Sequence, residues 1–254
     1  MSKVLAVAEQ RDGKFGSGAH EVVSVSARLA QDLGSTAHAV VLAGTGVSLD
    51  ASSLGSFGAE KTVVIEHDAL ADYNPEAWVG ALEHLIREGE YGVVVFSATT
   101  LGKDLAPRIA AHLDVPLATD VTAVDVSEGM VSVTRPVFSG KAFAHLEIDA
   151  SPALISIRPN VFPSVESVAE GEVTTVVPDL NVSDFRIRVV EREGSSDGVV
   201  DVSEASVIVS GGRGMKAPEN WSLLESLREV LGADAALGAS RAVVDAGWRP
   251  HGEQ

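Results

Sequence analysis

The sequence has no cysteine among its 254 residues. Disulfide bonds, thiolate metal sites and cysteine nucleophiles are therefore excluded, and the absence fits a reducing compartment. No apolar run approaches the length of a membrane span, and the N-terminus lacks the apolar core of a signal peptide. These features predict a cytoplasmic protein that is not embedded in a membrane.

Basic residues are scarce. The chain has 19 Lys and Arg against 36 Asp and Glu, which gives a formal net charge of −17. Such a chain repels the phosphates of nucleic acids and an anionic membrane surface, so neither is expected as a partner. The charge serves solubility or steers a basic partner. Hydrophobic residues make up 45%, enough for a large core.

Short apolar runs alternate with helical patterns over the first 113 residues. The runs cover residues 4–8, 37–42, 62–65 and 93–96, and the helical patterns cover 22–33, 75–86 and 101–113. Strands that are apolar throughout are typical of a sheet covered on both faces. The pattern therefore predicts a parallel α/β domain with right-handed crossovers.

The pattern changes after Val115. Residues 120–125, 130–135, 142–148 and 153–158 are strand-like, with turns at Glu128-Gly129 and Ser139-Gly140. They predict an antiparallel addition to the sheet. Alternation over residues 185–189 predicts one more half-buried strand.

A second α/β pattern follows a run of Gly, Ser and Asp. We predict an N-terminal domain over residues 1–193, a linker over 194–203 and a partial second domain over 204–254. This second domain has a strand at 206–209, a glycine turn, an amphipathic helix at 220–231 and a strand at 235–237. The helix is expected to turn four residues inward: Trp221, Leu224, Leu227 and Leu231.

The glycine turn, Ser210-Gly211-Gly212-Arg213-Gly214, is the first candidate for chemistry. Glycines after a strand let backbone N–H groups approach a phosphate, and Arg213 adds a cation with fork geometry. The pattern is neither the dinucleotide G-x-G-x-x-G nor a P-loop. An ordinary turn between strand and helix remains open as the alternative.

Other motifs are weaker. Residues 238–242 are similar to a G-x-S-x-G nucleophile elbow, but Ala242 replaces the second glycine and His251 is the one histidine that follows. Ser240 is therefore interpreted as a hydrogen-bonding hydroxyl. Gly102-Lys103-Asp104 lacks the Ser or Thr of a P-loop. The seven histidines show no i, i+3 or i, i+4 pair, so a metal site is not expected.

Taken together, these segments closely resemble the electron transfer flavoprotein alpha subunit family. The resemblance is carried by residues 207–216, Glu219-Asn220, 237–247, 102–110, 135–142 and 158–163. It covers nearly the entire chain in the family's order. It implies that the second domain is the opening part of a doubly wound flavin-binding domain.

The family resemblance also implies a role. A family member is an electron carrier rather than a catalyst of substrate turnover, and pairs with a beta subunit to hold one FAD. Electrons pass from flavin dehydrogenases, such as the acyl-CoA dehydrogenases of fatty acid β-oxidation, to a quinone oxidoreductase. The family pattern places Arg241 against the isoalloxazine ring. Arg213, Gly214 and Ser240 are expected beside the ring or the phosphates.

The chain ends at Gln254, where the family continues with a V-G-Q-T-G-K stretch that lines the flavin pocket. We therefore expect a further C-terminal stretch in the complete protein. A non-redox alternative is a flavin-free docking module that pairs with a beta-like subunit. A free-standing adenine-nucleotide binder is a third reading, but residues 1–190 show no phosphate motif.

Overall fold

The computed structural model describes residues 2–166, 171–191, 202, 205, 207–232 and 235–254. The chain divides into two compact units, Met1–Val190 and Glu191–Gln254. The predicted linker over residues 194–203 lies outside the described residues except at position 202, so the linker stays a prediction.

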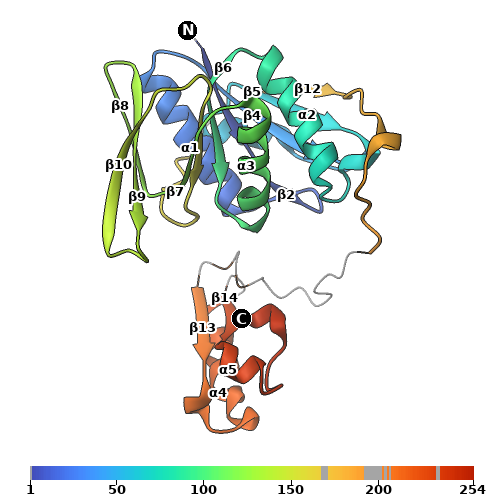
Figure 1. The fold of residues 1–254 in the computed structure, drawn as a ribbon. Coiled ribbons are helices and arrows are strands. Elements are labelled where there is room, and N and C mark those ends of the chain that lie inside the picture. Colours follow the sequence, from blue (N-terminus) through green and yellow to red (C-terminus); the bar gives the residue numbers. More distant parts are fainter. Residues whose placement is uncertain (1, 167–170, 192–201, 203–204, 206, 233–234) are drawn as a thin grey trace. The chain divides into compact units, whose positions relative to one another are not determined.

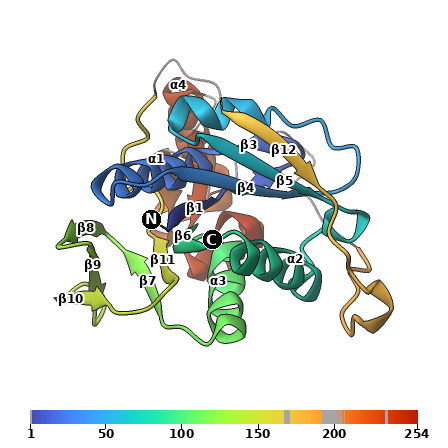
Figure 2. The same ribbon diagram turned by 90° about the horizontal axis from the view of Figure 1, so that it is seen from above.

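A seven-stranded parallel sheet forms the centre of the first unit (Figures 1 and 2). The strands run in the order β12 (Glu172–Val176), β5 (Lys61–Glu66), β4 (Ala37–Ala43), β1 (Lys3–Val7), β6 (Tyr91–Ser97), β11 (Ala153–Ile157) and β7 (Leu117–Val121). Every neighbouring pair is parallel. The predicted parallel α/β domain is confirmed.

Helices cover both faces of this sheet. Helix α1 (Ser17–Asp32) packs on one face, whereas α2 (Pro75–Glu88) and α3 (Thr100–Leu113) pack on the other (Figure 2). Alternate residues of a strand belong to the two cores, as Val4 and Leu5 of β1 do. Both of these side chains are fully buried, which explains why the strands are apolar throughout.

A separate three-stranded antiparallel sheet adjoins the large one (Figure 1). It consists of β8 (Ala123–Ser127), β9 (Met130–Val137) and β10 (Ala142–Ile148). Both predicted turns are confirmed, since Gly129 and Gly140 have φ of 80° and 83°. A second small hairpin joins β2 (Gln10–Arg11) to β3 (Lys14–Phe15).

The assignment of residues 153–158 to the antiparallel addition was wrong. These residues form β11, which lies between β6 and β7 in the parallel sheet. Likewise residues 117–121, which overlap the predicted strand at 120–125, form β7 at the edge of that sheet. Every residue of β11 is buried, as expected for an interior strand with helices or strands on both faces. The sequence of β11 directly follows the hairpin of β9 and β10, and this position in the chain suggested that it would pair with them.

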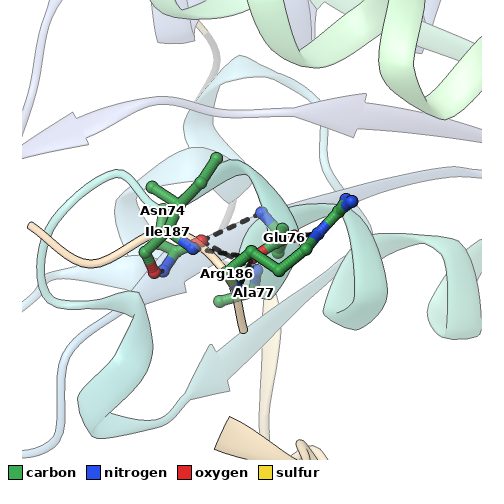
Figure 3. A network of polar contacts seen from close by, with 5 residues as sticks. All are labelled: Asn74, Glu76, Ala77, Arg186 and Ile187. Atoms are coloured by element: carbon green, nitrogen blue, oxygen red, sulfur yellow. Dashed lines mark hydrogen bonds and ion pairs between the residues drawn. The ribbon is translucent and has the colours of Figure 1, made fainter. Parts of the chain in front are cut away.

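The predicted strand over residues 185–189 was also wrong. These residues have no strand partner; they lie against the start of α2 (Figure 3). The Glu76 carboxylate accepts hydrogen bonds from the backbone N–H groups of Arg186 (2.6 Å) and Ile187 (3.1 Å) and from Arg186 Nε (3.0 Å). These bonds replace a sheet ladder, and they hold the pKa of Glu76 below its usual value.

Asn74 joins the same network to the helix. Its Oδ1 accepts from the N–H groups of Glu76 (3.0 Å) and Ala77 (3.4 Å), which makes it the N-cap of α2. Its Nδ2 donates to the carbonyl of Ile187 at 2.9 Å. The Asn74 side chain is buried, so one residue both starts α2 and fastens the segment that leaves the first unit.

The second unit is a single β-α-β crossover. Parallel strands β13 (Val207–Gly211) and β14 (Ala235–Ala239) flank α4 (Ser222–Leu231), and the short helix α5 (Arg241–Val244) follows. Among its described residues, the hydrophobic cluster is small: Trp221, Ala239 and Val243 are buried in it, and Met215, Leu224, Val244 and Trp248 pack against them. This architecture confirms the predicted order of strand, glycine turn, helix and strand in the second domain.

The orientation predicted for α4 was half right. Trp221 is buried and Leu224 packs against it, but Leu227 and Leu231 are 49% and 48% exposed. Two strands make a sheet too narrow to cover the full length of the helix. The apolar side chains near the end of α4 therefore remain in contact with solvent.

We predict that Asn74→Ala lowers the free energy of unfolding of the protein by about 1–3 kcal/mol. The change removes a helix cap and leaves the Ile187 carbonyl without its donor. Urea denaturation followed by circular dichroism measures the loss. Asn181→Ala is the matched control, because Asn181 bonds Asp184 on the exposed surface; a loss as large in the control would contradict the assigned role of Asn74.

Candidate functional site

The carboxyl ends of β13 and β14 meet at one edge of their sheet. Gly211 is in register with Ala239, and Ser240 N–H donates to the Gly211 carbonyl at 2.9 Å. The turn that follows β13 and the residues that follow β14 are therefore neighbours. Ligands of parallel α/β sheets bind at this edge, so all four site residues predicted from the sequence lie at the expected end of the strands.

The glycines differ in the room that they leave at this edge. A Cβ on Gly212 would lie 3.2 Å from Ser240 Oγ, whereas one on Gly214 would meet no atom within 4 Å. The Ser240 hydroxyl is exposed and does not cap α5. The turn and Ser240 thus bring backbone and hydroxyl groups together at this edge.

A third glycine has a structural role. A Cβ on Gly211 would lie 2.5 Å from Leu224 Cδ1 and 2.7 Å from the Trp221 ring. Such distances are far inside van der Waals contact, so the site needs glycine for α4 to approach the strand end. Gly211 is therefore a packing glycine, whereas the open space of this turn lies at Gly214.

Two arginines follow the carboxyl ends of β13 and β14. Arg213 opens the turn at Arg213–Met215 and is exposed. The Arg241 side chain is 80% exposed, and its Nε lies 3.3 Å from Asp245 Oδ2. Exposed pairs of this kind contribute about 0–1 kcal/mol. Arg241 can therefore exchange this partner for an anionic or carbonyl group of a ligand at little cost.

Sequence reasoning missed Arg249. Its guanidinium lies 5.7 Å from the centre of the Trp221 ring and bonds Glu253 through Nε (2.6 Å) and NH2 (2.5 Å). A further bond joins NH1 to Glu225 of α4 at 3.1 Å. The i, i+4 spacing of Arg249 and Glu253 was the available signal. Arg249 fastens residues 249–253 to the helix that supports the turn.

The donor set suits a ligand with phosphate and carbonyl oxygens. It offers glycine backbone, one hydroxyl and two guanidinium groups, with open space at Gly214. The residues present therefore fit part of a flavin dinucleotide site. Within the described ranges, no group of three His, Cys, Asp or Glu side chains could hold a metal ion.

Comparison with known proteins agrees with this geometry. Residues 4–181 match the electron transfer flavoprotein domain, and residues 201–254 match the electron transfer flavoprotein FAD-binding domain. The described helices include none that is long and apolar enough to cross a membrane.

Relatives align along almost the whole chain. The electron transfer flavoprotein subunit alpha of Thermoanaerobacterium thermosaccharolyticum is 36% identical over 245 residues, which cover 95% of this chain and 73% of the relative. The electron transfer flavoprotein subunit alpha of Bacillus subtilis is 34% identical over 250 residues, which cover 97% of this chain and 74% of the relative. The acryloyl-CoA reductase electron transfer subunit beta of Anaerotignum propionicum is 30% identical over 277 aligned residues, which cover 97% of this chain and 75% of the relative. The chain belongs to the electron transfer flavoprotein alpha subunit family.

We predict that Gly211→Ala destabilises the second unit by about 1–3 kcal/mol, because the new methyl group overlaps Leu224 and Trp221. Gly214→Ala is the matched control: space is open there and Gly214 does not adopt a left-handed backbone, so stability should be unchanged. Urea denaturation followed by tryptophan fluorescence measures both. Equal stability of the two variants would refute the packing role of Gly211.

Proposed function

We propose that this chain is the FAD-binding subunit of a heterodimeric electron carrier. The observation that carries the proposal is the turn at the joined ends of β13 and β14, where Gly212 lies close to Ser240 and Gly214 leaves open space. The match of residues 201–254 to the FAD-binding domain supports it. When bound, the flavin supplies reversible one- and two-electron chemistry.

The residues of the chain have distinct roles in this proposal. Gly212 and Gly214 let the backbone approach the cofactor phosphates, and Arg213 neutralises phosphate charge. Ser240 donates or accepts a hydrogen bond at the cofactor. Arg241 places a positive charge at the flavin ring; a unit charge about 4 Å from a reduced, anionic ring is worth roughly 4 kcal/mol at an effective dielectric of 20, and less at an exposed position.

A beta subunit is the partner in this proposal. The first unit, with its complete seven-stranded sheet, provides the surface for packing on that subunit and carries no redox group. The electron donors are flavin dehydrogenases of the acyl-CoA dehydrogenase class, and the acceptor is a quinone oxidoreductase. The chain works in the cytoplasm as a carrier and turns over no substrate itself.

The docking module without flavin remains the second candidate. The observation in its favour is the small core of the second unit, which contrasts with the two large cores of the first. A module of this kind would bind its partner through the first unit alone.

Co-purification of the chain with the beta subunit, followed by visible absorption spectroscopy, separates the two candidates. We expect a yellow complex with a flavin spectrum. A stable but colourless heterodimer would support the docking module instead, and would exclude FAD binding by the residues present.

Arg241→Ala should weaken the binding of FAD to this complex by roughly tenfold to a hundredfold, because a charge-assisted hydrogen bond of about 1.5–3 kcal/mol is lost. Quenching of FAD fluorescence during titration measures the affinity. Arg188→Ala, an exposed arginine of the first unit, is the control and should leave the affinity unchanged. An unaltered affinity of the Arg241 variant would show that this side chain does not contact the cofactor.

A further inference from the structure

Charged residues from three separate motifs gather around Asp120 in the first unit. Arg158, which follows β11, donates Nε to Asp120 Oδ1 (2.9 Å) and NH2 to Oδ2 (2.5 Å). Hydrogen bonding to Arg158 is the first cause that lowers the pKa of Asp120, and the charges of Lys103 and Arg135 lower it further. One carboxylate is thus surrounded by three cations.

Two of these cations, Lys103 and Arg135, act on Asp120 without a direct ion pair to it. Among the residues that the structure describes, neither Lys103 nor Arg135 forms an ion pair, and Arg135 Nε is buried without a hydrogen-bond partner. Lys103 is exposed in the first turn of α3, where the positive end of the helix dipole adds to its charge. In a chain of formal net charge −17, this is a local surplus of positive charge.

A cavity of about 240 Å³ opens beside Lys103. Its polar lining comes from Lys103, Thr119, Asp120 and Ser156, and apolar residues such as Pro107 and Leu117 complete the wall. Ser156 Oγ accepts from Asp120 N–H at 3.2 Å, so its own hydroxyl proton remains able to donate. At about 30 Å³ for each water molecule, the cavity has room for the end of one or two side chains.

The charge of the lining selects the occupant. Arg158 neutralises Asp120, so Lys103 leaves a single positive charge at the cavity. One carboxylate group matches that charge, whereas the charge of a phosphate dianion would exceed it. A partner protein supplies single carboxylates on its Asp and Glu side chains. Their negative charge is complementary to the Lys103 ammonium group beside the cavity.

We propose that this Lys103 socket (Lys103, Thr119, Asp120 and Ser156) receives an Asp or Glu side chain of the beta subunit, with the Lys103 ammonium as its ion-pair partner. The inference rests on the proposed function, because it assigns the docking surface of the proposed heterodimer.

Charge reversal tests the socket. Lys103→Glu places a carboxylate in the first turn of α3, which the helix dipole favours, so the fold is retained. Titration calorimetry with the purified beta subunit should show affinity at least about tenfold weaker than wild type at low salt. The difference should shrink at 0.5 M salt in rough proportion to the screening of the ion pair, for which the Debye length is then only about 4 Å.

Lys14→Glu is the matched control, since Lys14 is exposed, forms no ion pair among the described residues, and changes the net charge equally. Its affinity should stay within about twofold of wild type. Lys103→Met, which removes the charge without adding another, should give an intermediate loss. A beta-subunit Glu→Lys or Asp→Lys variant that restores binding to Lys103→Glu identifies the inserted side chain.

The outcomes are separable. If wild type binds the beta subunit and Lys103→Glu behaves like Lys14→Glu, the socket is refuted while the heterodimer stands. If wild type does not bind the beta subunit at all, the proposed function itself fails and the socket fails with it. Circular dichroism of each variant confirms that the loss of affinity does not come from unfolding.

Discussion

The close approach of α4 to the strand end at Gly211 is the constraint on which the candidate site depends. Trp221 and Leu224 occupy the space that any side chain at position 211 would need. Trp221 is in turn covered by Arg249, which bonds Glu225 and Glu253. This arrangement fixes the turn after β13 against β14, so Gly212 and Ser240 become neighbours while Gly214 stays open. The packing of α4 against Gly211 thus holds the turn in the position that leaves Gly214 open.

Much of this organisation follows from the sequence. Apolar runs at residues 4–8 and 93–96 predicted buried parallel strands, because both faces of such strands are covered. The helical pattern predicted over residues 75–86 is α2, and Pro75 stands in its first turn, where proline loses no hydrogen bond. The candidate site residues were predicted from a glycine turn combined with family motifs. Their shared position at one strand edge follows from the parallel pairing of β13 and β14.

The errors have a common physical origin in long-range contacts. Residues 185–189 alternate like a strand, but the Glu76 carboxylate accepts the backbone N–H groups that a sheet partner would otherwise take. The strand at 153–157 follows a hairpin in sequence, yet it inserts between β6 and β7. Local periodicity identifies an extended backbone but does not identify its partner. The exposure of Leu227 likewise depends on how many strands lie beneath α4.

Positive charge is sparse in this chain, and part of it stands at the two candidate sites for an anion. Arg213 and Arg241 stand at the open turn of the second unit, and Lys103 stands at the socket of the first. The central claim concerns the turn. Backbone amide NMR of the labelled chain during FAD addition tests it most directly. The account predicts shift changes concentrated at Gly212, Gly214 and Ser240; changes confined to the first unit, or none at all, would contradict it.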